Sequence, residues 1–256
     1  MDNVSKEYLV KLLDKGNRID GRKLEDIRKI EIGYDLSKHA EGSARVKIGD
    51  TEVFVGVKLE VSEPFPDKPD EGTIIVNTEM LPLSSSEFEP GPPNVNSIEL
   101  ARVVDRAIRE SKAIDLKKLC IEEGKKVWMV LIDIYTINND GNLQDASALA
   151  ALAALKQAKI PEYNGEKVDY SKRSGKLPIV SSPIECSMIK IKDKLLSDPC
   201  FEEENMMDAR LTTGITENND ICAMQKGGKG VLHIDDINKI LEINLKNSEK
   251  LRKLLK

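Results

Sequence analysis

One loop of this 256-residue chain has the form of a phosphate-binding loop but lacks the side chains that hold a phosphate. The stretch INNDGNLQDASALAALAALKQA, residues 137–158, runs from a glycine-containing loop into an alanine- and leucine-rich segment, which predicts a buried helix. The first N–H groups of a helix are unpaired and lie at its positive end, so they form a ready anion site. Yet the loop offers no Arg, Lys, Ser or Thr before the helix, and Asp145 adds a negative charge. These residues leave open whether an anion binds here.

A second group of chemically capable residues lies in the segment SDPCFEEEN, residues 197–205. It brings together four carboxylates: Asp198, Glu202, Glu203 and Glu204. Carboxylates this close in sequence can share a magnesium ion or act as an acid and base pair. An ordinary acidic loop on an acidic protein has the same composition.

Three arginines recur in the segment ELARVVDRAIRESKAI at helical spacing. At 100° per residue, Arg102, Arg106 and Arg109 share a sector of about 60°, opposite an aliphatic face. The planar donors of arginine can pair two phosphate oxygens at once, so this stripe suits phosphate recognition. The alternative is a solvated face on which the arginines pair with nearby carboxylates, namely Glu99, Asp105 and Glu110.

The remaining composition restricts the class of protein. Four widely spaced cysteines with no CxxC motif, and only two histidines, argue against a zinc site. No apolar run reaches the roughly 20 residues that span a bilayer, and the N-terminus lacks the features of a signal peptide, so we expect a cytoplasmic protein. A net charge of −5 argues against wholesale coating of nucleic acid but allows a local basic patch.

The first part of the chain supplies the elements that must position these residues. We expect a short helix from Ser5, as N-cap, to Asp14, two strands joined at Gly49-Asp50, and a further strand near residues 73–77. The segment 81–96 contains four prolines and no period, which predicts a long loop. A helix over residues 97–114, with Asn96 and Glu99 spaced like a capping box, carries the arginines. The nearly continuous apolar run KVWMVLIDIYTI predicts a strand buried on both faces.

The second part repeats the order of strands followed by a helix. Residues 161–181 are turn-rich and polar and predict a linker between an N-terminal domain, 1–160, and a C-terminal domain, 182–256. The C-terminal domain is expected to contain the strand PIECSMIKI, a hairpin turning near residues 218–220, and a helix with Asp235 as its N-cap. The order indicates an α+β fold of two βα layers packed together.

Four segments taken together, in this order, resemble the RNase PH family. They are RIDGRKLEDIRKIEI, GSARVKIGDTEVFVGVKLEV, ELARVVDRAIRES and INNDGNLQDASALAALAAL. The resemblance implies an RNase PH-like fold, with an N-terminal part like domain 2 of ribosomal protein S5 and a smaller C-terminal α/β part. It also implies phosphorolytic 3′→5′ exoribonuclease chemistry, in which phosphate releases nucleoside diphosphates from an RNA 3′ end, and assembly into six-membered rings.

The catalytic features of that family are degenerate here. A Gly-Ser/Thr-Arg phosphate loop aligns with Asn142, Leu143 and Gln144, and Asp145 follows beside the expected anion position. At ~4 Å and an effective dielectric of ~20, two like unit charges repel by about 4 kcal/mol. That exceeds the ~1–2 kcal/mol that a helix end can return, so we expect no phosphate or sulfate to bind.

The family's pair of catalytic aspartates is also incomplete in this sequence. The pair aligns with Asp198 and with Glu204, whose side chain is one methylene longer, so the resemblance implies no catalytic residue and no metal site in this chain.

The retained arginines and the lost phosphate chemistry resemble the non-catalytic RNase PH-type subunit of the archaeal exosome. The resemblance implies a subunit that is inactive alone and alternates with a catalytic RNase PH-type paralogue in a ring of three heterodimers. Arg102, Arg106 and Arg109 are then expected to bind the backbone of single-stranded RNA, and RNA-binding cap proteins are expected partners. Phosphate and a divalent metal are expected only at the catalytic partner. Two alternatives stay open, namely a self-sufficient phosphorolytic enzyme and a ring scaffold without RNA contacts.

Overall fold

A six-stranded sheet forms the larger layer of the structure, a computed structural model that describes residues 6–255. Its main path runs β1-β2-β3-β6-β4, and β5 pairs with β6. Neighbouring strands are antiparallel, except that β4 runs parallel to β6. The strands are β1 (Ile30–Tyr34), β2 (Gly42–Ile48), β3 (Thr51–Ser62), β4 (Thr73–Met80), β5 (Cys120–Glu122) and β6 (Lys126–Asn138).

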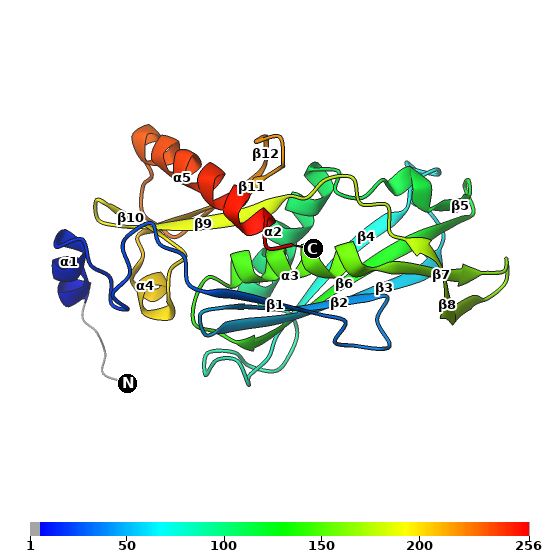
Figure 1. The fold of residues 1–256 in the computed structure, drawn as a ribbon, viewed down its shortest axis with the longest axis horizontal. Helices are drawn as coiled ribbons and strands as arrows, with labels where there is room; N and C mark the ends of the chain where they lie inside the picture. Colours follow the sequence, from blue (N-terminus) through cyan, green and yellow to red (C-terminus); the bar gives the residue numbers. More distant parts are fainter. Residues whose placement is uncertain (1–5, 256) are drawn as a thin grey trace.

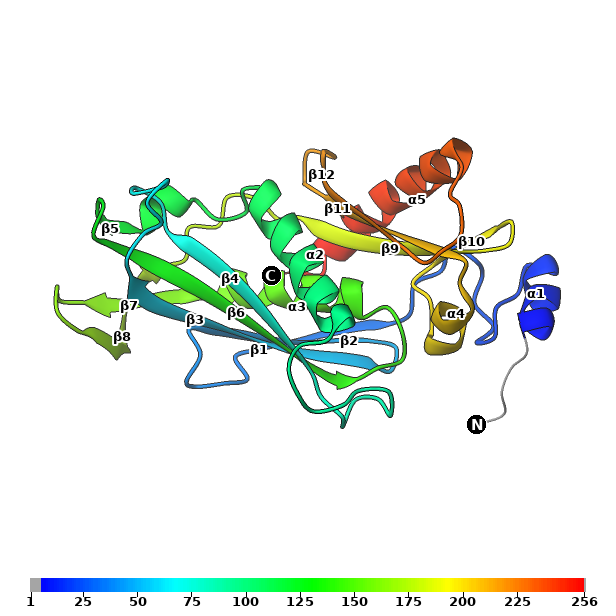
Figure 2. The ribbon, with the colours of Figure 1, turned by 180° about the vertical axis from the view of Figure 1, so that it is seen from behind.

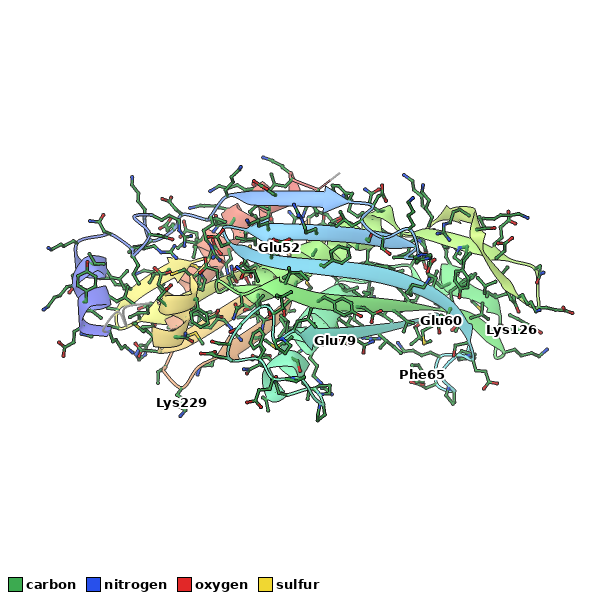
Figure 3. All side chains as sticks on the ribbon, turned by 90° about the horizontal axis from the view of Figure 1, so that it is seen from below. Glu52, Glu60, Phe65, Glu79, Lys126 and Lys229 are labelled. Carbon is green, nitrogen blue, oxygen red and sulfur yellow. The ribbon has the colours of Figure 1, made fainter. Side chains whose placement is uncertain are left out.

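Helices α2 (Val95–Glu110) and α3 (Leu143–Gln157) lie on one face of this sheet (Figure 1). The other face is seen in Figure 3, where Glu52 and Glu60 of β3 and Glu79 of β4 are labelled. β6 therefore alternates between buried and half-buried residues, and the prediction that it is buried on both faces was wrong. The apolar run suggested full burial because half-buried positions on the face away from the helices, such as Leu131, also carry apolar side chains.

The central helix α3 is buried along almost its whole length, as its composition predicts. It packs on β2 and β3 of the large sheet and on β9 of the second sheet. Its alanines permit a close approach: a Cβ on Gly42 would lie 2.8 Å from the Cα of Ala158, at the end of the helix. The helix that carries the degenerate loop is thus fixed on several sides.

The second layer is a four-stranded antiparallel sheet with the order β10-β9-β11-β12. Its elements are β9 (Ile184–Ile191), β10 (Lys194–Ser197), α4 (Phe201–Met206), β11 (Ala209–Ile215), β12 (Ile221–Gly227) and α5 (Ile234–Arg252). Helix α5 packs on β9 and β11 (Figures 1 and 2). The main hydrophobic core includes Ile184, Cys186 and Leu251, so the two layers share one core. The predicted α+β fold of two packed layers is confirmed.

Residues 161–181, expected as a linker, lie largely within a two-stranded hairpin. β7 (Lys159–Tyr163) pairs with β8 (Val168–Lys176), and the hairpin projects from the end of the large sheet away from α1 (Lys6–Asp14) (Figure 2). Trp128 on β6 and Tyr163 form an edge-to-face pair with 6.2 Å between ring centroids, which holds the turn end of the hairpin against the large sheet.

Two helix starts differ from the prediction. The N-cap of α2 is Asn94, whose side chain accepts from the Ser97 N–H at 2.9 Å, rather than Asn96. The N-cap of α5 is His233 rather than Asp235, and Asp236 accepts the His233 N–H at 2.9 Å. Several acceptors stand near each start, so spacing alone does not select among them. The proposed Ser5 cap of α1 lies outside the described residues. Among the helices described, none combines the length and the apolar character that a membrane crossing requires.

Candidate functional site

The degenerate loop is held by a left-handed residue at the start of α3. Asn142 is the N-cap, with φ 57° and ψ 41°, and Gly141 before it has φ 80°. A Cβ on Gly141 would lie 2.5 Å from the carbonyl carbon of Cys200, so only glycine allows the loop to touch the segment after β10. The loop and the acidic segment, 56 residues apart in sequence at Asn142 and Asp198, are therefore in contact.

A carboxylate of the protein itself occupies the positive end of α3. The Asn142 N–H donates to Oε2 of Glu204 at 3.0 Å, and the other oxygen of Glu204 lies 3.4 Å from the Arg210 guanidinium. An anion bound at this helix end would meet the Glu204 charge directly. The aligned second carboxylate of the family thus serves here as an internal ligand of the helix end.

Asp145 lies deeper, on the inner side of the first turn. Its Oδ2 accepts from the Ser187 N–H on β9 and from the Asn142 side-chain amide, both at 3.0 Å. Burial raises the pKa of Asp145 to about 6, although these hydrogen bonds oppose the shift. Asp145 was expected to occupy the positive end of the helix, and it does lie in the first turn of α3. The N–H of the cap residue Asn142, however, is bound by Glu204.

The other two positions of the loop have no phosphate-binding chemistry. Leu143 belongs to the main hydrophobic core. Gln144 is 5% exposed, and no hydrogen-bond partner within residues 6–255 reaches its Oε1.

Asp198 is fully engaged by structural contacts. Its two oxygens accept from the Arg28 guanidinium at 2.7 and 2.9 Å, and further bonds come from the Arg28 N–H, Arg22 and the Asn142 side chain. Burial alone would raise the pKa of Asp198, but the Arg28 contacts outweigh it and hold the pKa below its usual value. The same pairing raises the pKa of Arg28 above its usual value, against the effect of burial. Asp198 therefore acts as an anchor for residues 22–28.

Glu203 forms a second anchor in the same segment. It accepts from Nε of Arg18 at 2.9 Å, and both side chains are fully buried. Arg18 also donates to the carbonyl oxygens of Ser197 and Asp198. Across residues 6–255, no group of three or more His, Cys, Asp or Glu side chains is arranged to hold a metal ion.

The arginines of α2 line a groove between this helix and β4, which is an edge strand of the large sheet. The groove has a volume of about 410 Å³, and Arg102, Arg106 and Arg109 are all exposed beside it. The three arginines differ in how many hydrogen bonds and ion pairs their side chains form. No ion pair or hydrogen bond within the described residues reaches the Arg102 side chain, whereas Arg106 donates to Gln225 at 3.2 Å.

Arg109 is the most engaged of the three. It donates to both oxygens of Asp105, at 2.7 and 3.2 Å, and to the Ile74 carbonyl of β4 at 3.0 Å. Arg102 and Arg106 thus have more donors free for a ligand, whereas Arg109 ties α2 to the sheet.

Several residues of the site were not predicted from the sequence. Arg18, Arg28 and Arg210 balance the buried carboxylates, and Glu185 on β9 is 2% exposed with neither carboxyl oxygen partnered among the described residues. Burial raises the pKa of Glu185 well above its usual value. A signal existed for Glu185, since a lone carboxylate interrupts the apolar run PIECSMIKI. The arginine partners are set only by folding.

Comparison with known proteins places this geometry in a family. The exosome complex component Rrp42 of Methanothermobacter thermautotrophicus is 47% identical over 94% of this chain and 90% of that protein. The component of the same name from Archaeoglobus fulgidus is 46% identical over 99% of this chain and 96% of that protein.

Solved structures agree with these relatives. The Archaeoglobus fulgidus exosome with RNA bound to the active site contains a chain that superposes with a TM-score of 0.92 at 46% identity, covering 98% of this chain and 97% of that one. A chain of an archaeal exosome core superposes with a TM-score of 0.86 at 43% identity, covering 97% of this chain and 94% of that one. Rice Rrp46 has a TM-score of 0.71 at 17% identity, which shows a shared fold alone.

The family models agree in both layers of the fold. Domain 1 of the 3′ exoribonuclease family matches residues 26–161, and domain 2 matches residues 181–247. With two relatives above 40% identity along nearly the whole chain, this protein belongs to the 3′ exoribonuclease, or RNase PH, family.

Proposed function

We propose that this chain is a non-catalytic exosome subunit that binds the RNA backbone and completes a ring with a catalytic RNase PH-type paralogue. Three copies of each would alternate, and the chain would have no exonuclease activity alone. The names of the archaeal relatives and the RNA-bound exosome structure support this assignment. We further propose that the ring works in the cytoplasm and carries RNA-binding cap proteins.

The single observation that carries the proposal is the occupied end of α3. In a phosphorolytic enzyme, inorganic phosphate must reach the hydrogen-bond donors of the active site. Here Glu204 accepts the cap N–H at 3.0 Å, and Asp145 and Asp198 both accept from the side-chain amide of Asn142. A dianion brought among these carboxylates would be repelled by several kcal/mol (about 4 kcal/mol per unit charge pair at ~4 Å). Phosphate and the divalent metal are therefore assigned to the paralogue.

RNA contact is assigned to the groove between α2 and β4. Arg102 and Arg106 stand exposed there, and an arginine fork pairs well with phosphate oxygens. Contacts to phosphate make binding insensitive to base sequence and sensitive to salt.

Assembly and activity can be tested together. The chain, the paralogue and their mixture are analysed by light scattering and incubated with RNA, magnesium and phosphate. We expect a six-membered ring in the mixture, with nucleoside diphosphate release only there. Nucleoside diphosphates from the purified chain alone would establish the self-sufficient enzyme instead.

RNA binding has its own variant pair. Arg102→Ala combined with Arg106→Ala should weaken RNA binding by the assembled ring roughly tenfold. The slope of the logarithm of the binding constant against the logarithm of the salt concentration should become less steep by ~1.4, since each phosphate contact on a single strand contributes ~0.7. Lys246→Ala with Lys250→Ala removes two exposed positive charges on α5 and is the matched control. Equal affinity of both double variants, with intact rings, would indicate a scaffold without RNA contacts.

A further inference from the structure

The cavity beside the degenerate loop has a lining unlike that of a phosphate site. It has a volume of about 330 Å³, at the small end of the ~300–1,000 Å³ typical of ligand pockets. It lies where the loop after β4, the start of α2, the first turn of α3, α4 and β11 meet. Its charged lining consists of three carboxylates and one guanidinium: Glu87, Glu99, Glu204 and Arg210.

Arg210, the one cation among the described lining residues, is paired through its terminal nitrogens, while its buried Nε has no partner within residues 6–255. Arg210 is 8% exposed, and its terminal nitrogens donate to Glu99 at 2.9 Å and lie 3.4 Å from Glu204. Glu87 is exposed at the rim, and no ion pair within residues 6–255 involves it. The cavity therefore retains an excess of negative charge, which favours a positively charged ligand.

A buried acceptor points to the same conclusion independently. Gln144 lines the cavity, is 5% exposed, and has an Oε1 that no donor reaches within the described part of the chain. A buried amide oxygen without a donor destabilises the protein, so a ligand that brings an N–H to it gains binding energy. No hydroxyl or ammonium of the surrounding elements supplies that donor among the contacts described.

We propose that this cavity binds an organic cation rich in N–H donors, a guanidinium or alkylammonium group, at the place where an active family member would hold an anion. The free acceptors are Gln144 Oε1, the second carboxyl oxygen of Glu99 and the Glu87 carboxylate. Apolar side chains in the lining accommodate the flat faces or methylene groups of such a ligand: Phe88, Leu100, Phe201 and Met207. A bare metal ion does not fit, because no metal-holding group of acidic side chains occurs among the described residues.

The cationic group can come from two sources: a free amine such as a polyamine, or a basic side chain of a neighbouring protein chain. Both present several N–H donors on a positive group to the same acceptors. The test therefore starts with small probes and the full chain alone, and then repeats the measurement in the assembled ring. Only this second step rests on the proposed function.

The direct measurement follows the side-chain amide of Gln144 by nuclear magnetic resonance at low salt. Ethylguanidinium and spermidine are titrated in turn, and Gln157, half-buried at the far end of α3, provides the reference signal. We expect a saturable shift at Gln144 and little change at Gln157. Similar, unsaturable shifts at both glutamines would overturn the proposal.

Charge variants distinguish cation binding in this cavity from non-specific attraction of cations to an acidic protein. Glu87→Gln with Glu99→Gln should weaken cation binding about tenfold by calorimetry. Glu123→Gln with Glu249→Gln removes the same charge from exposed positions and should leave the affinity unchanged. Equal losses in the two double variants would refute a specific site, and the Gln144 titration of the unmodified chain decides the matter if the first variant fails to fold.

Two further outcomes locate the ligand. If the Gln144 response disappears in the ring, a side chain of the neighbouring subunit fills the cavity, whereas a retained response identifies a free amine as the ligand. Inorganic phosphate should not shift Gln144. A saturable phosphate response would overturn both the cation site and the assignment of this chain as non-catalytic, while a missing cation response overturns the cation site alone.

Discussion

At the scale of single residues, Asp145 makes the stability of the protein depend on pH. Burial raises its pKa to about 6, against ~3.9 in an unfolded chain. The folded state therefore binds this proton more tightly than the unfolded state does. Its stabilising contribution is full below about pH 4 and is lost as the pH rises through about 6, with a total change of up to about 3 kcal/mol.

The variant Asp145→Asn isolates this effect. Asparagine retains an oxygen that can accept from the Ser187 N–H but cannot ionise. We expect Asp145→Asn to exceed the wild type in free energy of unfolding by about 1–3 kcal/mol at pH 8 and to match it near pH 4, measured by urea unfolding. The exposed Asp67→Asn is the control. A stability difference for Asp145→Asn that does not change with pH would contradict the assignment.

The residue types in the loop predicted the loss of phosphate-binding side chains. They did not predict which group of the protein binds the helix end instead. The sequence shows Asn142, Leu143 and Gln144 where a phosphate loop would have other side chains. That Glu204 accepts the cap N–H depends on a contact across 62 residues, which no local pattern reveals. The sequence therefore predicts the position of the site but not its internal ligand.

At the scale of elements, the packing of β2 against α3 depends on a glycine. A Cβ on Gly42 would lie 2.8 Å from the Cα and N of Ala158 and still closer to the Ala154 carbonyl oxygen. Backbone atoms of a buried helix cannot move aside cheaply. We expect Gly42→Ala to lower the free energy of unfolding by about 2–3 kcal/mol in urea titrations.

Gly175 on β8 offers a matched comparison for that substitution. A Cβ there meets nothing within 4 Å, so Gly175→Ala should be neutral or slightly stabilising. If Gly42→Ala proved as harmless as Gly175→Ala, β2 and α3 would not pack as closely as described.

The type of an element, helix or strand, could be predicted wherever the hydrophobic periodicity was clear. The first and last residues of the elements were predicted less well. The helix carrying the arginines begins at Val95 instead of residue 97, because Asn94 supplies the cap. Strand β6 was assigned correctly, but its exposure was not, since a sheet covered by helices on one face still carries apolar residues on the other. The hairpin of β7 and β8 has a polar composition that resembles a linker, and only its pairing identifies it.

At the scale of the whole molecule, the segment before β1 connects the two layers. Arg18 reaches Glu203 of α4, and Arg28 reaches both Asp198 and the Asp140 carbonyl oxygen of the loop before α3. The retained carboxylates of the degenerate site thus hold the second sheet, the loop and the N-terminal segment together. This structural role explains how acidic residues remain useful in a chain that we propose to be non-catalytic.

The pair of Arg18 and Glu203 tests that connection. Both side chains are fully buried, so removing one charge leaves the other unpaired in a medium of low dielectric. We expect Glu203→Gln to lower the free energy of unfolding by about 3 kcal/mol, and Arg18→Met to do the same, because each breaks a buried pair whose disruption costs about 3–5 kcal/mol. Glu242→Gln breaks an exposed pair with Lys246 on α5 and should change stability by less than about 0.5 kcal/mol.

Hydrogen exchange distinguishes a tie between layers from a purely local contact. If Glu203 and Arg18 connect them, Glu203→Gln should speed exchange in α4 and also in residues 17–28, which lie about 180 positions away in sequence. Faster exchange in α4 alone would show that the acidic segment stabilises only itself. Because Arg28 and Asp198 continue the same connection to the start of α3, we also expect faster exchange at Asn142, where the Glu204 carboxylate is held against the helix end.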